Sequence, residues 1–190
     1  MNEEYGEKSK RSWYGLAKMN TNKKNVFLEA LSERLLENKD FILQENERDI
    51  ANGVEKGLSS ALIDRLKLDD KRIEGMSKGV RDIIALPDPV GKIEGMKRLP
   101  NGLLVGKMRT PIGSILIIYE ARPNVTVDAF VLCFKSGNAT ILKGGSEAIN
   151  SNRALIRIIK DTLTECDMDP DMVQFVDSTD RTILNDLLKM

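Results

Sequence analysis

Hydrophobic and polar positions follow two different patterns along the chain. Between about residues 21 and 86, apolar side chains recur every three or four positions among charged residues, which is typical of helices with one buried face. From residue 112 onward, short apolar runs alternate with helical stretches, as expected for buried parallel strands joined by helices. The sequence therefore predicts an α/β fold, in which helices over 21–86 precede a βαβαβ unit over 112–190.

Turn residues set the limits of the three predicted strands. Pro123, which lacks a backbone N–H, requires a turn after the first strand, and Gly137 is placed to end the helix between the first two strands. Strands joined by helices in this way run parallel by default, and open parallel sheets bind ligands where their strands end. The expected strands are Ser114–Tyr119, Asn138–Lys143 and Val173–Val176.

Four helices and a hairpin are expected before the sheet. The first runs from a cap at Thr21 or Asn22 to about Asn38, and the second runs from Asp40 to Asn52-Gly53. The third covers Leu62–Leu66 behind a cap at Ser59 or Ser60, and the fourth runs from Asp69 or Asp70 to just before Pro87 and Pro89. Pro100-Asn101-Gly102 predicts a tight turn between two strands within residues 92–109. Residues 1–11 are expected to be a mobile tail, and Ser178-Thr179-Asp180 is expected to open a last helix.

The charge balance and the rare residue types exclude several classes of function. Lys+Arg 29 equals Asp+Glu 29, whereas binding to nucleic acid or to an anionic membrane relies on clustered basic charge. No apolar run approaches the ~20 residues of a membrane span, and the amino terminus lacks the layout of a signal peptide. Two cysteines make no disulfide framework and no metal-ligand spacing, so the cytoplasm is the expected compartment. The chain has no histidine, which excludes acid–base catalysis by that residue.

Two strings of residues resemble a known family. They are YEARPNVTVDA over 119–129 and KSGNATILKGGSEAINSNRAL over 135–155, and both are similar to the γ-glutamyl phosphate reductase (glutamate-5-semialdehyde dehydrogenase) family of the aldehyde dehydrogenase superfamily. The resemblance extends from about Ser12 to Met190. It implies a Rossmann-like NADP-binding domain, incomplete over 12–190, a homo-oligomer, and subunit contacts made by the hairpin at 92–109.

The resemblance also implies a reaction. The family reduces L-glutamate 5-phosphate with NADPH to L-glutamate 5-semialdehyde and phosphate in proline biosynthesis, through a thioester formed on a cysteine. Cys133 lies on an apolar stripe and Cys166 lies near the end of the next helix, whereas the family places its nucleophile in a later, catalytic domain. The chain is therefore expected to be an amino-terminal fragment that lacks the catalytic domain and is inactive alone. A non-catalytic nucleotide-binding module and an assembly remnant are the alternatives.

Asn124 is the expected catalytic residue. By resemblance, its side-chain amide helps to form an oxyanion hole for the acyl oxygen, and one such donor typically supplies ~3 kcal/mol of transition-state stabilisation. The turn alone favours a helix cap at this position, because a short polar side chain can accept hydrogen bonds from free N–H groups. The two roles can coexist.

Lys143 and the turn after it are the expected cofactor site. The resemblance implies that Lys143 bonds the adenosine ribose or its phosphate, while Gly144 and Gly145 lack the Cβ atoms that would keep a ligand off the backbone. Ser146 and Glu147 are expected at the start of the next helix, where free N–H groups and the helix dipole favour an anion. Ser146 suits a 2′-phosphate and Glu147 suits ribose hydroxyls, so which of the two meets the ribose stays open, and NADP(H) is favoured over NAD(H). Without the resemblance, an ordinary turn with a solvated lysine explains these residues, because the GxGxxG pattern is absent.

Arg122 is the expected substrate ligand, since its planar guanidinium suits a carboxylate or an acyl phosphate. An ion pair with Glu120 or Asp128 that holds the turn is the alternative. Tyr119 and Glu120 are expected to shape the pocket at the strand exit. Three residues of the second string are assigned to the surface of a helix: Ser151, Asn152 and Arg153.

Overall fold

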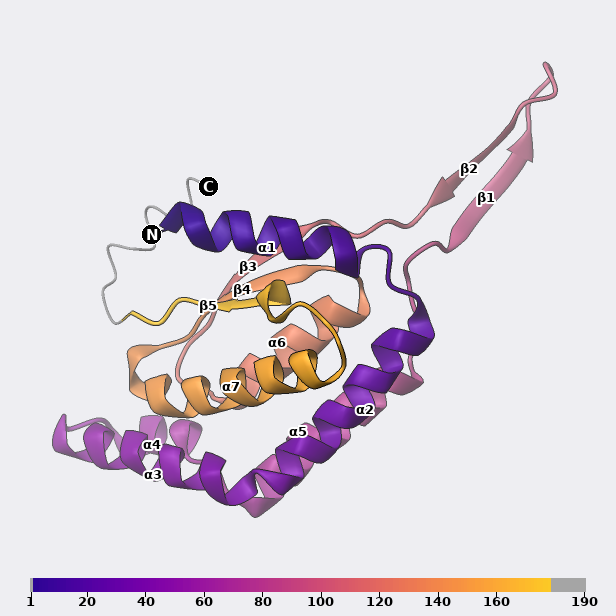
Figure 1. Ribbon diagram of the computed structural model, residues 1–190. Helices are drawn as coiled ribbons and strands as arrows, with labels where there is room; N and C mark the ends of the chain where they lie inside the picture. The colour runs from indigo at the N-terminus through magenta and orange to yellow at the C-terminus, as the bar shows by residue number, and fades with distance from the viewer. Residues whose placement is uncertain (1, 179–190) are drawn as a thin grey trace.

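A parallel sheet of three strands forms the centre of the protein (Figure 1). The computed structural model describes residues 2–178, so the helix expected to open at Ser178-Thr179-Asp180 lies outside the described residues. The strand order is β3-β4-β5, and both neighbouring pairs are parallel. This confirms the α/β fold with a βαβαβ unit. The strands are β3 (Ser114–Ile118), β4 (Ala139–Lys143) and β5 (Val173–Phe175).

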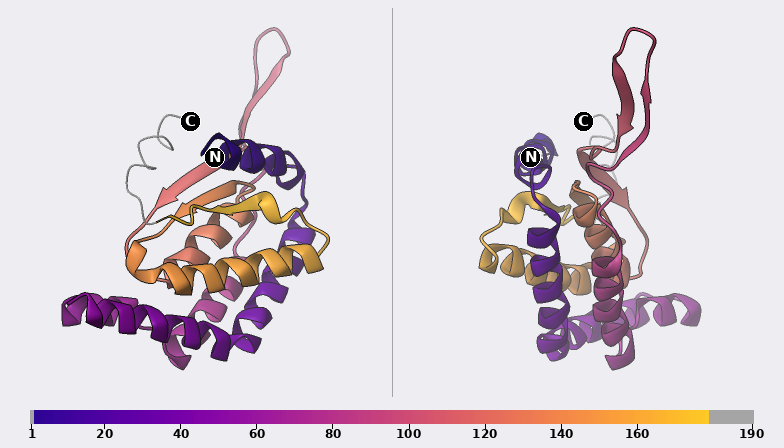
Figure 2. Two further views of the ribbon diagram at one scale, coloured as in Figure 1. Left: turned by 60° about the vertical axis from the view of Figure 1, so that its left-hand side comes forward. Right: turned by 90° about the vertical axis from the view of Figure 1, so that its right-hand side faces the viewer.

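Helices cover both faces of this sheet (Figures 1 and 2). The connecting helices α6 (Asn124–Lys135) and α7 (Ile149–Glu165) lie on one face. Helix α1 (Asn2–Leu16) lies across the other face, where it contacts all three strands. Gly137, with φ +78°, follows α6 as expected, because glycine adopts this left-handed conformation without strain.

The prediction of a mobile tail over residues 1–11 is wrong for residues 2–11, which belong to α1. The side chains of Ser9 and Ser12 are buried in the packing of this helix. The hydroxyl of Ser9 bonds that of Ser114 in β3, and Ser12 Oγ donates to Asp171 O at 2.9 Å. The charged sequence does not reveal this packing because the buried positions are small polar residues and not large apolar ones.

Four helices form a further layer outside α6 and α7. Ser59 and Asp69 cap the third and fourth of these as predicted. Asn20 caps the first helix by accepting from Lys23 N at 2.9 Å, so the caps expected at Thr21 or Asn22 are wrong. No helix within residues 2–178 is long and apolar enough to cross a membrane. The four helices are α2 (Thr21–Glu37), α3 (Lys39–Glu55), α4 (Ser60–Leu66) and α5 (Asp70–Ala85).

Helix α3 does not end at Asn52-Gly53 as expected but continues to Glu55. Gly53 is closely packed there: a Cβ atom at this position would lie 3.0 Å from side-chain carbons of both Leu58 and Ile63, which would have to shift. The left-handed residue that follows the helix is Gly57, with φ +71°. Gly53, the glycine expected to end the helix, instead allows close contact between α3 and α4.

An aromatic cluster joins the outer helices to the sheet layer. Phe27 of α2 lies 4.5 Å from Phe134 and 5.9 Å from Phe130 of α6, measured between ring centroids. All three side chains are fully buried. Each buried aromatic side chain removes a large apolar area from water, so this cluster is a main source of hydrophobic stabilisation between the two layers.

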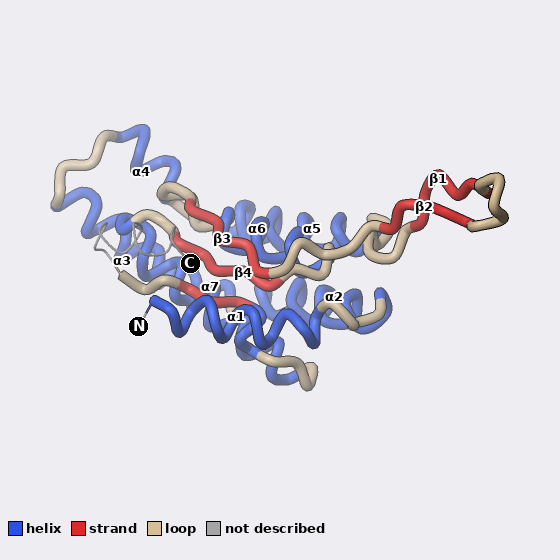
Figure 3. The backbone as a smooth tube through the Cα atoms, turned by 90° about the horizontal axis from the view of Figure 1, so that it is seen from above, coloured by secondary structure: helices blue, strands red, loops and turns tan. Residues whose placement is uncertain are grey.

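The predicted hairpin is confirmed and projects away from the rest of the chain (Figure 3). It consists of β1 (Ile93–Arg98) and β2 (Leu104–Met108), and every residue of both strands is exposed. Gly102 adopts φ +86° in the connecting turn. The hairpin and α4 lie at opposite ends of the structure (Figures 1 and 3).

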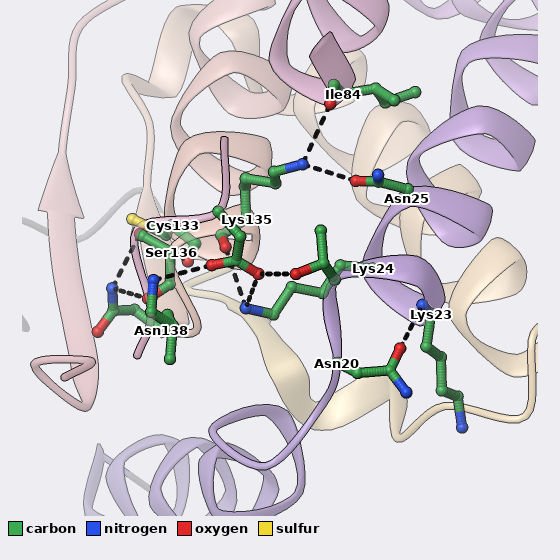
Figure 4. Close-up of polar contacts among 12 residues, drawn as sticks. Asn20, Lys23, Lys24, Asn25, Ile84, Cys133, Lys135, Ser136 and Asn138 are labelled. Atoms are coloured by element: carbon green, nitrogen blue, oxygen red, sulfur yellow. Dashed lines mark hydrogen bonds and ion pairs between the residues drawn. The ribbon is translucent and has the colours of Figure 1, made fainter. Parts of the chain in front are cut away.

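A buried ion pair joins α2 to the loop that leads into the hairpin. Lys24 Nζ, whose side chain is 1% exposed, donates to Asp88 Oδ2 at 2.9 Å and to Lys135 O at 3.1 Å. The neighbouring Lys135 Nζ donates to Asn25 Oδ1 at 2.6 Å and to Ile84 O at 3.2 Å (Figure 4). Each buried ammonium group thus has acceptors from other elements, as burial of charge requires.

A second buried carboxylate lies at the amino terminus of α7. Asp49 of α3, which is 1% exposed, accepts hydrogen bonds from the backbone N–H groups of Asn150 and Ser151 at 3.1 and 2.7 Å. It also accepts from Asn150 Nδ2 at 2.8 Å and from Ser151 Oγ at 2.6 Å. A negative charge at a helix amino terminus is stabilised by the free N–H groups and the helix dipole. The assignment of Ser151 to the helix surface is therefore wrong.

We expect replacement of Asp49 by alanine to lower the free energy of unfolding by about 3 kcal/mol, because buried donors lose their acceptor and α7 loses its capping charge. Urea unfolding of Asp49→Ala measures this loss. Glu47→Ala, which removes an exposed carboxylate from the same helix, is the matched control and should change stability by less than about 0.5 kcal/mol. Equal losses in the two variants would contradict the capping role.

Stability should also depend on the charge of Asp88. Burial alone raises the pKa of this carboxyl, but hydrogen bonds from Val90 N–H and Lys24 outweigh burial and hold the pKa below its usual value. A pKa that is lower in the folded than in the unfolded chain means that ionised Asp88 stabilises the fold above about pH 4, and that this contribution disappears as the pH falls through the folded pKa.

The wild-type chain should therefore be more stable than Asp88→Asn at pH 7, and the difference should shrink below about pH 4. Urea unfolding of both chains between pH 7 and pH 3 measures this. Glu74→Gln, which changes an exposed carboxylate of α5, should show no such trend. A difference that stays constant over the whole range would contradict the role of the ionised carboxylate.

Candidate functional site

The candidate site lies where β3 and β4 end. Ile118, the last residue of β3, is paired with Lys143, the last residue of β4. Beyond the strands, Tyr119 N donates to Lys143 O at 3.0 Å and Gly145 N donates to Glu120 O at 3.3 Å. The two turns that carry the predicted site residues are therefore held side by side at the edge where parallel sheets bind ligands.

Asn124 is the first residue of α6 and is not its cap. The capping position is held by Pro123 and receives no side-chain hydrogen bond, so the interpretation of Asn124 as a helix cap is wrong. Instead, Asn124 Nδ2 donates to Asp128 Oδ2 at 3.1 Å, one turn further along the helix. This bond holds one amide N–H, and the other has no acceptor among residues 2–178.

Asp128 orients this amide in a partly desolvated environment. Burial raises the pKa of the Asp128 carboxyl, and the hydrogen bond from Asn124 opposes that shift only in part. The carboxyl faces α5, where a Cβ atom on Gly79 would lie 3.9 Å from Asp128 Oδ1. Through this hydrogen bond, the Asp128 carboxyl orients the amide of Asn124.

A cavity of about 430 Å³ opens beside Asn124. One wall comes from the turn after β3 and the first turns of α6, and the other comes from α4, α5 and the link between them. Arg122 lines this cavity but pairs with neither Glu120 nor Asp128. The alternative of an ion pair with either carboxylate is therefore wrong. Lys143 does not line it. The lining residues are Asp64, Arg65, Lys67, Leu68, Arg72, Gly75, Met76, Arg122, Asn124 and Asp128.

Lys143 is buried at the end of β4, where its side chain turns back on the backbone. It is 7% exposed, and its Nζ donates to Gly144 O at 2.9 Å. Burial lowers the pKa of this ammonium group, while the charges of Glu147 and Asp177 oppose the shift. Two of its three N–H donors have no acceptor among the described residues, so the group can still bind a ligand oxygen.

Ser146 and Glu147 lie in a short 3₁₀ helix, η1 (Ser146–Ala148), and α7 begins only at Ile149. The expectation that these two residues open the long helix is therefore wrong. The N–H groups of Asn150 and Ser151 at the true start of α7 are bonded to Asp49. The free N–H groups that would favour an anion there are thus already satisfied within the protein.

A chain of buried hydrogen bonds connects the two turns. Tyr119 Oη lies 2.6 Å from Thr126 Oγ1, which donates to Asn152 Oδ1 at 2.7 Å. Burial raises the pKa of Tyr119 to about 12, so the phenol stays neutral. Asn152 is fully buried, and its assignment to the helix surface is wrong.

Gly144 is required by this packing. A Cβ atom at this position would overlap Asn152 Nδ2 and would lie 3.1 Å from the ring of Tyr119. The sequence assigns both turn glycines to the approach of a ligand. For Gly144, the space that a side chain would need is filled by the protein itself.

Neither cysteine is near Asn124. Cys133 lies nine residues later in α6, about 13 Å along the helix axis at ~1.5 Å per residue, and burial raises the pKa of its thiol. Cys166 follows α7, and burial raises the pKa of its thiol as well. Neither thiol lines the cavity, so this chain places no reactive thiolate at Asn124.

Sequence reasoning missed the wall of the cavity formed by α4, α5 and their link. Lys67, Arg72 and Gly75 belong to no motif, and only tertiary packing brings them to the end of β3. One local signal was available, because Gly75 and Gly79 interrupt an otherwise regular helical pattern. A glycine inside a helix usually has a reason in packing or function.

Comparison with known proteins identifies the relatives of the chain. No family model matches it. It is 50% identical over 184 residues to γ-glutamyl phosphate reductase of Dictyoglomus turgidum, and 53% identical over 188 residues to the reductase of the same name from a Sulfurihydrogenibium species. These matches cover 97% and 99% of the chain. The chain is a homologue of γ-glutamyl phosphate reductase.

The chain spans less than half of the length of these reductases, namely 44% and 42% of the two relatives. The crystal structure of the γ-glutamyl phosphate reductase of Thermotoga maritima matches 98% of the chain with a TM-score of 0.95 at 38% identity, and the chain covers 45% of it. A probable aldehyde dehydrogenase from Listeria monocytogenes matches with a TM-score of 0.73 at 12% identity, over 39% of its own chain. This more distant match shows a shared fold.

We expect Gly144→Ala to destabilise the chain by about 2 kcal/mol, because the added methyl group overlaps the Asn152 amide in a closely packed site. Urea unfolding measures the loss. In the double variant Gly144→Ala/Asn152→Ala the loss should be smaller than the sum of the two single losses, since the overlap is removed. Gly75→Ala, where a Cβ atom meets nothing within 4 Å, is the control and should not destabilise. Strict additivity in the double variant would contradict the overlap.

Proposed function

We propose that this chain serves in the NADPH-dependent reduction of L-glutamate 5-phosphate to L-glutamate 5-semialdehyde and phosphate. Its relatives at about 50% identity are named γ-glutamyl phosphate reductase. The observation that carries the proposal is the edge of the sheet at which β3 and β4 end. There, Asn124 follows β3 and Lys143 ends β4, and each keeps N–H donors that have no acceptor among residues 2–178.

Asn124 is the proposed oxyanion donor. Asn124 lines a cavity together with Arg122, whose guanidinium has no hydrogen bond or ion pair within the described part of the chain, and Asp128 accepts one N–H of the Asn124 amide. A donor that is already oriented stabilises negative charge on an acyl oxygen without reorganisation during the reaction. Arg122 would bind an anionic group of the same substrate through its planar fork.

The residues after β4 suit the adenosine end of a nicotinamide cofactor. Two N–H donors of the Lys143 ammonium have no acceptor among the described residues, and the hydroxyl of Ser146 bonds none of these residues either. Together with the Glu147 carboxylate, these groups match ribose hydroxyls and a 2′-phosphate. NADP(H) in preference to NAD(H) is part of this proposal, in which the bound cofactor supplies the hydride.

A reaction through a thioester needs a thiolate next to Asn124. Cys133 and Cys166 both lie away from the cavity, and burial raises the pKa of each thiol. We therefore propose that the 190 residues bind the cofactor without turning over the acyl phosphate. The same observation favours the second candidate function, a nucleotide-binding module without catalysis.

Four further expectations belong to the same proposal. The protein acts in the cytoplasm, and it assembles as a homo-oligomer. The hairpin β1–β2 supplies contacts between subunits, which agrees with its exposed strands. The pathway is proline biosynthesis, as the resemblance implies.

The test of the cofactor site is NADPH binding to the purified chain, followed by the fluorescence of the reduced nicotinamide. We expect Lys143→Gln to raise the dissociation constant about tenfold, because one charge-assisted hydrogen bond contributes roughly 1.4 kcal/mol or more. Lys56→Gln, at an exposed lysine after α3, is the control and should leave it unchanged. Equal binding by both variants would refute the assignment of Lys143. Turnover of glutamyl phosphate by the chain would refute the absence of a nucleophile.

A further inference from the structure

We propose that the cavity beside Asn124 binds the phosphoryl group of the acyl phosphate, and that Lys67 is an anion ligand in it together with Arg122. This inference rests on the proposed function and extends it to a residue on the opposite wall of the cavity. No motif in the sequence indicates Lys67. Its assignment comes from the charges, the hydrogen bonds and the free space of the cavity.

The lining of the cavity has more positive than negative charge. Among the described residues, four cationic side chains line it, and two carboxylates, those of Asp64 and Asp128, oppose them. Asp128 already accepts the amide of Asn124. A concave surface with excess positive charge attracts an anion and concentrates the field inside the cleft. The four cations are Arg65, Lys67, Arg72 and Arg122.

Two of the four cations are already used by the protein. Arg72 donates to Asp64 O at 2.6 Å and also to Lys67 O, so it holds the carbonyl groups around the end of α4. Arg65 Nη1 lies 3.8 Å from Glu120 Oε2. By contrast, the ammonium of Lys67 and the guanidinium of Arg122 have no hydrogen bond or ion pair with any residue between 2 and 178. These two are the groups available to a ligand.

The backbone on both sides of Lys67 is fixed. Asn46 of α3, which is 1% exposed, donates through Nδ2 to Leu66 O at 2.8 Å and accepts at Oδ1 from Leu68 N at 2.7 Å. Its Nδ2 also donates to Ser151 Oγ at 3.0 Å. One buried amide thus holds the residues before and after Lys67 and joins them to α7. The base of the Lys67 side chain is therefore positioned before a ligand binds.

Gly75 keeps the cavity open. It lies inside α5 and lines the cavity, and a Cβ atom on it would meet nothing within 4 Å. A glycine in the interior of a helix is less stable than alanine by about 1 kcal/mol, and no neighbour requires it for packing here. A side chain at this position would extend into the space that a ligand needs.

The phosphoryl group is the part of the substrate that best matches these charges. The phosphate is attached to the same acyl carbon whose oxygen would accept from Asn124, so it must lie close to that amide. Arg122 precedes Asn124 by two residues in the same turn, and Lys67 faces it from the link between α4 and α5. Two cations match the charge of a phosphate group better than that of a single carboxylate.

Acetyl phosphate, an acyl phosphate without the amino-acid portion, is the probe. Its binding to the ¹⁵N-labelled chain can be followed from backbone amide shifts. We expect Lys67→Gln to raise the dissociation constant about tenfold, as for the loss of one charge-assisted hydrogen bond. Lys71→Gln removes an exposed lysine four positions away that does not line the cavity, so this matched control should bind like the wild type.

A second variant tests the cavity without changing its charge. Gly75→Met should weaken acetyl phosphate binding at least tenfold by filling the space, while the chain stays folded because methionine favours a helix more than glycine does. The inference is overturned if Lys67→Gln binds like Lys71→Gln, if Gly75→Met binds like the wild type, or if the wild type does not bind the probe.

The outcomes separate this inference from the proposed function. Binding of acetyl phosphate that depends on Lys67, in a chain that does not bind NADPH, would support the phosphoryl site and refute the reductase proposal. Binding of NADPH that depends on Lys143, with acetyl phosphate binding that is independent of Lys67, would refute the phosphoryl site and leave the reductase proposal standing.

Discussion

The carboxylate of Asp49 accepts hydrogen bonds from the first turn of α7, and this contact joins the amino-terminal helices to the sheet. Asn46, one turn earlier in α3, extends the same buried network to Ser151 and to the backbone around Lys67. One face of α3 therefore sets both the position of α7 and the position of the far wall of the cavity. The candidate site depends on this network because its two walls come from segments far apart in the chain.

The hydrogen bonds between the two turns have a comparable role on the side of the sheet. Tyr119 and Thr126 belong to the segment that carries Asn124, whereas Asn152 lies in α7, after the turn that carries Lys143. Gly144 allows Asn152 to approach because it has no side chain. Packed side chains thus link the turn of the proposed oxyanion donor to the proposed cofactor turn. A substitution in one turn will therefore change the position of the other.

Local signals in the sequence predicted the elements better than the contacts between them. The strands, the hairpin and the caps Ser59 and Asp69 follow from backbone chemistry within a few residues, so they were predictable. The buried roles of Asp49, Ser151 and Asn152 depend on partners about 25 to 100 residues away, and a polar residue on a helix gives no sign of such a partner. Lys67 was missed for the same reason. Asn124 and Lys143 could be chosen in advance only because their surroundings resemble a family.

The hairpin has a consequence for the behaviour of the chain in solution. Ile93, Met96, Leu104 and Met108 are each more than half exposed, on two strands that no other element within residues 2–178 covers. Unpaired strand edges with apolar side chains favour strand addition between molecules. The exposed hairpin therefore favours aggregation of the purified chain, in addition to the effect of the zero net charge.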